Sequence, residues 1–185
     1  MREKPSALRS LSSSRDLPEE NEQDLTPDQE ALRARGYLET LAATINPDDP
    51  LEAKRAVAVI VSQCIREEFR RNEIVWRQGS DSDSMKLLIV GEMIAYVEET
   101  DISEKIRRGS TIGELGLVNG TRRLSTVECV SDVAITYTLT REAWVNLERK
   151  NPKAARMIDL IVIRYLSQRV QHVSNRIYET RCLPI

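Results

Sequence analysis

The stretch TIGELGLVNGTRRLST, residues 111–126, brings together glycine, a carboxylate and guanidinium groups. We expect a single helical turn at its start, where exposed backbone N–H groups and the helix dipole favour an anion. Gly113 and Gly116 would let the backbone approach a ligand closely. Arg123 offers a planar fork of donors that suits a phosphate, and Glu114 offers an acceptor that suits a ribose hydroxyl. These residue types could therefore bind a sugar phosphate.

Two simpler interpretations of the same residues remain open. The stretch could be a surface turn in which Glu114 and Arg123 pair with each other, and composition alone favours that turn. Residues 122–125 also spell a basic-directed kinase site, R-R-x-S. We expect Ser125 to lie on or beside a strand, however, which is a poor conformation for a kinase substrate.

Composition argues against several other classes of function. The chain has 185 residues and a net charge of −2, which suits one domain with extensions and gives no general attraction to nucleic acid. Cys64, Cys129 and Cys182 are widely spaced, as expected of bystander thiols in a reducing compartment. The only histidine, His172, has no cysteine or histidine at metal-ligand spacing. No nucleophile stands beside a recognisable base, so we expect no catalytic residues, no metal site and no enzyme activity.

The elements that would position residues 111–126 follow from changes of pattern along the chain. Thr26 and Pro27 are typical of a helix start, and residues 46–50 break that helix. We predict the following division: a Ser-rich and charged tail at 1–25, helices at 26–62, a β core at 63–140, further helices at 141–178 and a short tail at 179–185.

The central region has the texture of an antiparallel β protein. Short segments rich in Val, Ile and Thr alternate with turn residues, which predicts a sandwich or barrel. The candidate strands are CIREEF, EIVWRQ, MKLLIV, MIAYVEE, ISEKIRR, TVECV and AITYTL. We expect residues 109–112 to form a tight turn.

The last long helix, predicted from Pro152 to Tyr178, carries an apolar stripe at spacings of three and four. Between Met157 and Leu166 it is apolar nearly all round. This pattern indicates burial on two sides, and we expect one of them to meet a partner. Homo-oligomer formation is left open.

Residues 111–127 resemble the phosphate-binding cassette of the cyclic nucleotide-binding domain family, in which Gly-Glu-Leu is followed by an arginine. The run 112–117 and Arg123 carry this similarity, and a second motif of the family matches between residues 77 and 92. The resemblance extends over about residues 64–178. It implies an α+β fold, an eight-stranded antiparallel β jelly roll flanked by N-terminal helices and by a long C-terminal helix that acts as hinge and lid.

The resemblance also implies roles for individual residues. Arg123 would pair with the cyclic phosphate and Glu114 would accept the ribose 2′-hydroxyl. Three positions depart from the family pattern. Leu124 stands where a small or hydroxylated residue is usual, Arg122 stands where proline is frequent, and Lys86 stands where an aromatic residue is usual. Tyr165 and Arg164 are candidates for closing over the base. The predicted site residues are Gly113, Glu114, Leu115, Gly116, Arg123, Leu124 and Ser125.

We therefore expect a regulatory module that senses cAMP or cGMP and relays binding through its C-terminal helix, with no cofactor. The alternative is a degenerate domain that binds no nucleotide. It would serve as a protein-interaction module of a membrane transporter or channel, and the chain resembles the tails of sulfate-permease-type transporters. No recognition helix for nucleic acid is expected, because only residues 179–185 follow the long helix. The expected location is the cytoplasm, or the cytosolic face of a membrane for a transporter tail.

Overall fold

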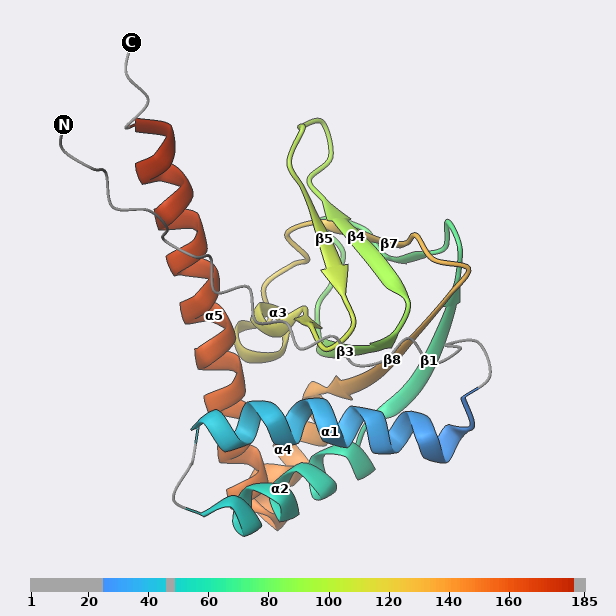
Figure 1. Cartoon of the computed structure of the whole chain (residues 1–185), viewed down its shortest axis with the longest axis vertical. Coiled ribbons are helices and arrows are strands. Elements are labelled where there is room, and N and C mark those ends of the chain that lie inside the picture. The colour runs from blue at the N-terminus through green and yellow to red at the C-terminus, as the bar shows by residue number, and fades with distance from the viewer. Residues whose placement is uncertain (1–24, 46–48, 182–185) are drawn as a thin grey trace, which may run out of the picture.

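The computed structural model describes residues 25–45 and 49–181, and it combines a β-roll with a layer of helices (Figure 1). Most of the two predicted tails therefore lies outside the described residues. The helices are α1 (Pro27–Ile45), α2 (Pro50–Ser62), α3 (Glu114–Asn119), α4 (Arg141–Lys150) and α5 (Pro152–Arg181). The strands are β1 (Ile65–Arg70), β2 (Ile74–Trp76), β3 (Ser84–Val90), β4 (Glu92–Tyr96), β5 (Ser103–Arg107), β6 (Thr111–Ile112), β7 (Thr126–Cys129) and β8 (Val133–Thr140).

The strands form two antiparallel sheets, with the orders β1-β8-β3-β6 and β2-β7-β4-β5. The predicted fold class is thus confirmed, and each of the seven candidate segments contains a strand. The expectation of a plain turn at residues 109–112 was wrong, because Thr111 and Ile112 form β6 and pair with Leu87 and Lys86 of β3. Two residues are too short to show the alternation that identifies a strand in a sequence.

Side chains cap the starts of three helices, and the sequence suggested the cap at Thr26. The backbone N–H of Thr26 donates to Oε1 of Gln29 at 2.8 Å, and the Thr26 hydroxyl accepts from the Gln29 N–H at 3.4 Å, which is a capping box. Asp49 caps α2 and Thr140 caps α4 in the same way. These caps supply partners for N–H groups that have none inside the helix.

Strand β3 separates two apolar cores because alternate side chains of a strand face opposite sides. Met85, Leu87 and Ile89 belong to the larger core, which also takes in α1, α2, α5 and β8. Leu88 belongs to the smaller core, which is enclosed between the two sheets. Lys86 and Leu88 therefore point into the roll, whereas a register shift between Leu88 and Val90 places Val90 in the larger core.

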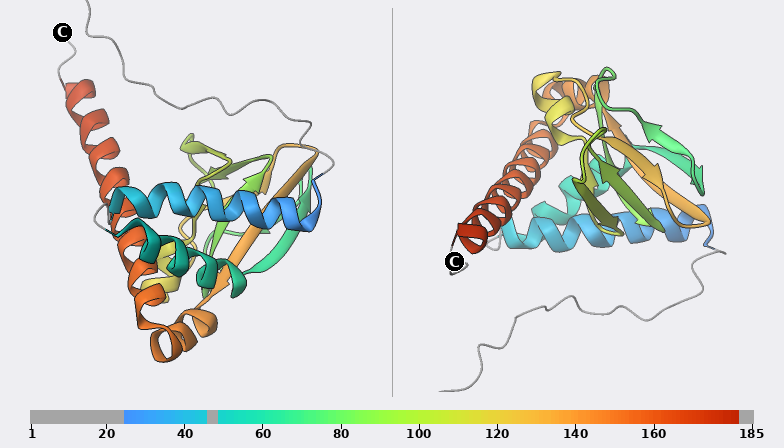
Figure 2. Two further views of the ribbon diagram at one scale, coloured as in Figure 1. Left: turned by 60° about the horizontal axis from the view of Figure 1, so that its bottom comes forward. Right: turned by 90° about the horizontal axis from the view of Figure 1, so that it is seen from above.

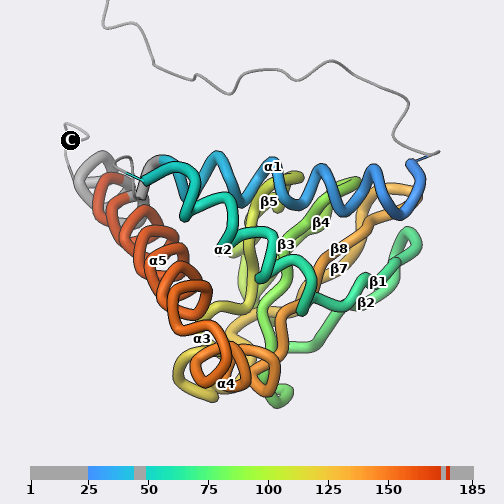
Figure 3. The backbone as a smooth tube through the Cα atoms, turned by 90° about the horizontal axis from the view of Figure 1, so that it is seen from below, coloured from blue at the N-terminus to red at the C-terminus, as the bar shows by residue number. Residues whose placement is uncertain are grey.

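The helices α1, α2 and α4 lie together at one end of the roll, and α5 runs from this layer past α3 and beyond the strands (Figures 1 and 2). Viewed from below, α1 and α2 cross the strands of the roll (Figure 3). A partly buried ion pair between Glu30 of α1 and Arg66 of β1 holds α1 in place, since the guanidinium engages both carboxylate oxygens. Ile158 and Ile161 of α5 are buried, whereas Ile163 is 59% exposed, so the first part of α5 is covered on one side only.

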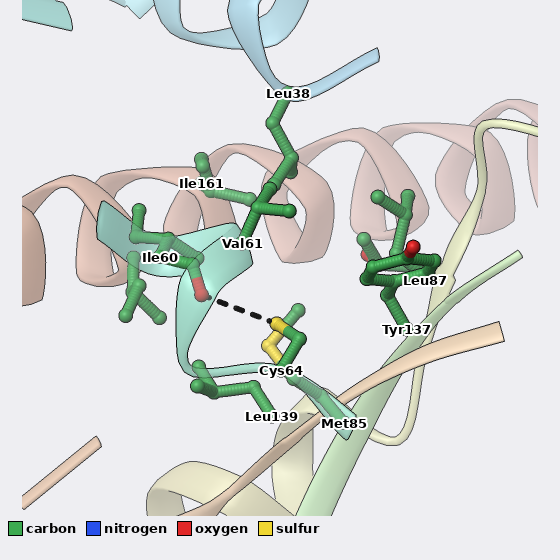
Figure 4. A pocket seen from close by; sticks show the side chains of 11 residues that line it. Leu38, Ile60, Val61, Cys64, Met85, Leu87, Tyr137, Leu139 and Ile161 are labelled. Carbon is green, nitrogen blue, oxygen red and sulfur yellow. Dashed lines mark hydrogen bonds between the residues drawn. The ribbon is translucent and has the colours of Figure 1, made fainter. Parts of the chain in front are cut away.

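A small apolar hollow lies between the helices and the first sheet (Figure 4). Cys64 lines it, and its thiol donates to the backbone oxygen of Ile60 at 3.4 Å. Burial raises the pKa of Cys64 to about 12, which makes the thiol unreactive at neutral pH. Cys64 and Cys129 are free thiols; Cys182 lies outside the described residues.

Two negative findings concern the described residues, 25–45 and 49–181. None of the helices there is both long and apolar enough to cross a membrane. Nor do three or more histidine, cysteine or acidic side chains gather there in a way that could hold a metal ion.

Candidate functional site

An open hollow lies beside α3, where about 470 Å³ of space, open solvent included, is lined by cassette residues, by residues of the roll and by one residue from α5. Gly113 precedes α3 with a φ of 83°, a left-handed conformation that glycine adopts without strain. Gly120 ends α3 in the same region of φ and donates its N–H to the Gly116 oxygen. The two glycines make α3 a short, closed turn between β6 and the loop that carries Arg123.

Arg123 is the dominant charge of this hollow and is only 7% exposed. Its Nη1 donates to the backbone oxygen of Ser84 at 2.9 Å and to that of Gly113 at 3.4 Å, and its Nη2 donates to the Ser84 hydroxyl at 3.0 Å. The guanidinium carbon lies 3.8 Å from the centroid of the Trp76 ring. The remaining nitrogen, Nε, is buried and has no hydrogen-bond partner. The guanidinium is thus held firmly while one of its donors stays free.

The backbone on either side of Arg123 explains why this side chain turns inward. The Arg123 N–H donates to the Ser80 oxygen at 2.9 Å, and the Gly79 N–H donates to the Arg123 oxygen at 2.8 Å. These two bonds fasten the cassette loop to the loop between β2 and β3. A Cβ at position 113 would lie 2.2 Å from Nη1 of Arg123, so the guanidinium occupies space that only a glycine leaves free.

Glu114 is the second buried charge, at 2% exposure, and it lines the hollow. The Thr111 hydroxyl donates to its Oε1 at 2.5 Å. Within the described part of the chain, the ion pairs found do not join Glu114 to Arg123. The simpler interpretation of an ion-paired surface turn therefore does not describe this segment, because both charged groups are buried and each has its own polar neighbours.

The structure brings the predicted site residues together. Gly113, Leu115, Gly116, Leu124 and Ser125 line the same hollow as the buried Glu114 and Arg123. Leu124 is 65% exposed, so its side chain does not fill the hollow. The Gly116 N–H already donates to the Gly113 oxygen at 3.1 Å, which makes it a less available donor than the sequence suggested. The roles of these residues toward a ligand remain predictions.

Sequence reasoning missed several residues of the hollow. Trp76 comes from β2, Ser82 from the following loop and Arg169 from α5, whereas Ala95, Ile112 and Val127 add apolar wall. Ile112 and Val127 belong to the cassette segment 111–127, whereas Trp76, Ser82, Ala95 and Arg169 lie outside it and only the fold brings them to it. The alternation of β2 and β7 could have assigned Trp76 and Val127 to the roll interior, but no sequence signal places Ser82 or Arg169.

The two candidates for a closing residue on α5 do not line the hollow; Arg169 does. Tyr165 has a different contact, because its hydroxyl accepts a hydrogen bond from the Thr111 N–H at 3.1 Å. Thr111 therefore contacts Glu114 through its side chain and α5 through its backbone. Arg169 forms an ion pair with Glu104 of β5 at 2.9 Å, which links α5 to the second sheet.

Burial governs the electrostatics of the site. It lowers the pKa of Arg123, and the nearby carboxylates of Asp83 and Glu114 oppose that change. Arginine nevertheless stays protonated in proteins. A cation buried among neutral donors and acceptors, without a carboxylate in an ion pair, is costly, and a bound anion would reduce that cost. The hollow is therefore suited to a small anion that also presents a hydroxyl to Glu114.

Comparisons with known proteins agree with this geometry. Residues 66–151 match the family described as "Cyclic nucleotide-binding domain". No match was found among curated protein sequences. Among solved structures, a cyclic nucleotide-binding domain from Methylobacillus flagellatus has a TM-score of 0.62 and 19% identity, with 82% of this chain and 88% of that chain covered.

Two larger proteins share the same fold. The catabolite activator protein of Thermus thermophilus has a TM-score of 0.54 and 19% identity, with 68% of this chain and 60% of that chain covered. The regulatory subunit of a cAMP-independent protein kinase A from Trypanosoma brucei has a TM-score of 0.54 and 19% identity, with 67% of this chain and 43% of that chain covered. The matched segment contains the hollow's Trp76, Glu114 and Arg123, and this part of the chain is similar to the cyclic nucleotide-binding domain family.

Proposed function

We propose that the chain is a regulatory module that binds cAMP or cGMP in the hollow beside α3. Arg123 pairs with the cyclic phosphate, and Glu114 accepts the ribose hydroxyl. The apolar side chains of Ala95, Ile112 and Val127 offer a surface for the base. The module works in the cytoplasm, where thiols such as those of this chain stay reduced.

The observation that carries the proposal is the state of Arg123. Its side chain is 7% exposed and stacked on Trp76, and it keeps a buried, unpartnered Nε beside the open hollow. A phosphate monoanion would supply the missing acceptor and offset the buried positive charge. Glu114, buried nearby and not in an ion pair with Arg123, adds an acceptor that a ribose hydroxyl can use.

Ligand binding would be transmitted to α5 through a series of contacts that begins at Glu114. A ligand hydroxyl on Glu114 would compete with the Thr111 hydroxyl, and the Thr111 N–H is bonded to Tyr165 of α5. Arg169 lines the hollow, and its guanidinium would leave its ion pair with Glu104 to bind the ligand. Binding then shifts α5 to the extent that the ligand's affinity differs between two positions of that helix. The exposed Ile163 and Val170 of α5 are apolar contacts for a protein partner that would sense the shift.

Thermal unfolding with and without each nucleotide tests the proposal. A ligand at one hundred times its Kd raises the free energy of unfolding by about 2.7 kcal/mol. Arg123→Ala should abolish the shift, and Arg123→Lys should weaken it because an ammonium cannot reproduce the fork of donors. Arg71→Ala is the matched control, since Arg71 is a partly exposed arginine paired with Asp132 and does not line the hollow.

A degenerate module that binds no nucleotide, for example the tail of a membrane transporter or channel, is the second candidate. One observation favours it: Nη1 and Nη2 of Arg123 already bind Ser84 and Gly113, so the guanidinium is mostly satisfied without a ligand. Among the structural relatives, the Trypanosoma brucei subunit is described as part of a cAMP-independent kinase. An unchanged melting temperature with both cAMP and cGMP, at millimolar concentration, would contradict nucleotide binding and favour this second function.

A further inference from the structure

Ser82 borders the hollow and carries a hydroxyl that the protein itself does not use. Ser82 lies in the loop between β2 and β3, is 7% exposed and lines the hollow. Its Oγ is buried and has no hydrogen-bond partner. Buried hydroxyl groups are nearly always hydrogen-bonded in folded proteins, so an unpaired one at a concave site points to a partner that binds there.

The position of Ser82 depends on a glycine of the cassette. A Cβ at position 116 would lie 1.4 Å from the Ser82 Oγ, so the hydroxyl rests where any other residue would carry its side chain. The hydroxyl is thereby pressed against the first turn of α3, on the same hollow as Arg123. Nε of Arg123 is the other unpartnered donor there. Two buried donors without partners thus border one cavity, from two loops far apart in sequence.

The side chain that follows Arg123 cannot take the same role. Leu124 offers no polar atom, and it is 65% exposed. Ser80, in the same loop as Ser82, is already engaged because its hydroxyl donates to the Arg77 oxygen at 2.7 Å. Ser82 therefore carries the hydroxyl of this loop that has no partner and belongs to a residue lining the hollow.

We propose that Ser82 is a ligand-binding residue whose hydroxyl donates a hydrogen bond to an oxygen of the phosphodiester that Arg123 holds. The inference rests on the proposed function, because it names a further contact of the same ligand. Its chemistry requires a bound group with at least two acceptor oxygens, one for the guanidinium and one for the hydroxyl. A cyclic phosphate has two such exocyclic oxygens.

Isothermal titration of the whole chain with cAMP and with cGMP tests this contact. Ser82→Ala should weaken binding by about tenfold to a hundredfold, the range for a lost hydrogen bond to a charged group. Ser80→Ala is the matched control and should leave the affinity within about twofold, because it removes a serine hydroxyl from the same loop that already has a backbone partner.

The two phosphorothioate diastereomers of the nucleotide sharpen the test. Each replaces one exocyclic oxygen with sulfur, which accepts hydrogen bonds poorly. Ser82→Ala should cost much less affinity for one diastereomer than for the other, because that analogue has already lost the oxygen that the hydroxyl binds. Equal losses for both diastereomers would contradict a direct contact.

The stability of the ligand-free protein provides a readout that needs no nucleotide. Because the Ser82 hydroxyl has no partner in the free protein, Ser82→Ala should leave the melting temperature unchanged or raise it. A clear fall would mean that the hydroxyl has a structural partner, and it would overturn the inference. If the unmodified chain binds neither nucleotide, the proposed function fails and the Ser82 contact with it. If it binds and Ser82→Ala binds equally well, only the Ser82 contact fails.

Discussion

The guanidinium of Arg123 lies over the indole of Trp76, 3.8 Å from the ring centroid. The same ring is approached by Nζ of Lys86 at 6.0 Å, so one aromatic side chain contacts two buried cations. Trp76 reaches this place from β2 in the second sheet, and Lys86 comes from β3 in the first. The indole therefore joins the two sheets at the point where the proposed phosphate group binds.

Replacing Trp76 should weaken nucleotide binding without removing any ligand contact by Arg123 itself. In Trp76→Leu the guanidinium loses its stacking partner and becomes more mobile, and we expect an affinity loss of about fivefold to thirtyfold, in keeping with a cation–π contact worth about 1–2 kcal/mol. Trp76→Phe keeps an aromatic face and should lose less. Titration calorimetry gives both values, and equal affinities of Trp76→Leu and the unmodified chain would show that the stacking does not position Arg123.

Gly113 should tolerate a methyl group poorly. Its φ of 83° disfavours any side chain, and a Cβ would lie 2.2 Å from Nη1 of Arg123. We expect Gly113→Ala to lower the free energy of unfolding by about 1–3 kcal/mol and to abolish nucleotide binding by displacing the guanidinium. Gly36→Ala is the control, because a Cβ at that position in α1 meets no atom within 4 Å. Nucleotide affinity that survives in folded Gly113→Ala would mean that Arg123 does not need its observed position.

The sequence was informative where local pattern determines structure. Caps such as Thr26 and Thr140 mark their helices because they satisfy N–H groups within one turn, and alternation marks the longer strands. The sequence did not predict the short strand β6, because its pairing with β3 is a tertiary contact. The residues of the hollow also fall into a predictable and an unpredictable group. The cassette is one contiguous segment, so the sequence could identify its residues as one site. Ser82 and Arg169 reach the hollow only through the packing of a loop and a distant helix.

The contact between Tyr165 and Thr111 should hold α5 against the roll. Tyr165→Phe removes the hydroxyl that accepts the Thr111 N–H at 3.1 Å and leaves that partly buried donor unpaired. We expect the free energy of unfolding to fall by about 1–2 kcal/mol and amide hydrogen exchange at Thr111 to accelerate. Urea unfolding and exchange measured by NMR check the two effects. Exchange at Thr111 as slow as in the unmodified chain would show that the hydroxyl does not secure β6 to α5.

The buried Lys86 predicts a distinctive dependence of stability on pH. Lys86 points into the roll, where its ammonium pairs with Glu67 and donates to the Thr138 hydroxyl at 2.9 Å. Burial lowers the pKa of Lys86 below its usual 10.5; Glu67 and Asp83 oppose that change, and Arg123 adds to it. The folded chain thus releases this proton at a lower pH than the unfolded chain does.

Raising the pH toward 10.5 should therefore favour the folded state at this residue, because in that interval the unfolded chain binds the proton and the folded chain does not. Lys86→Met removes the difference while keeping a flexible apolar stem in the roll. The free energy of unfolding of the unmodified chain should rise relative to that of Lys86→Met as the pH increases, by about 1.4 kcal/mol for each tenfold difference in proton affinity between the two states. Urea unfolding at a series of pH values measures the gap. A gap that stays constant or narrows would mean that the ion pair with Glu67, one-third exposed on the carboxylate side, outweighs the burial of the ammonium.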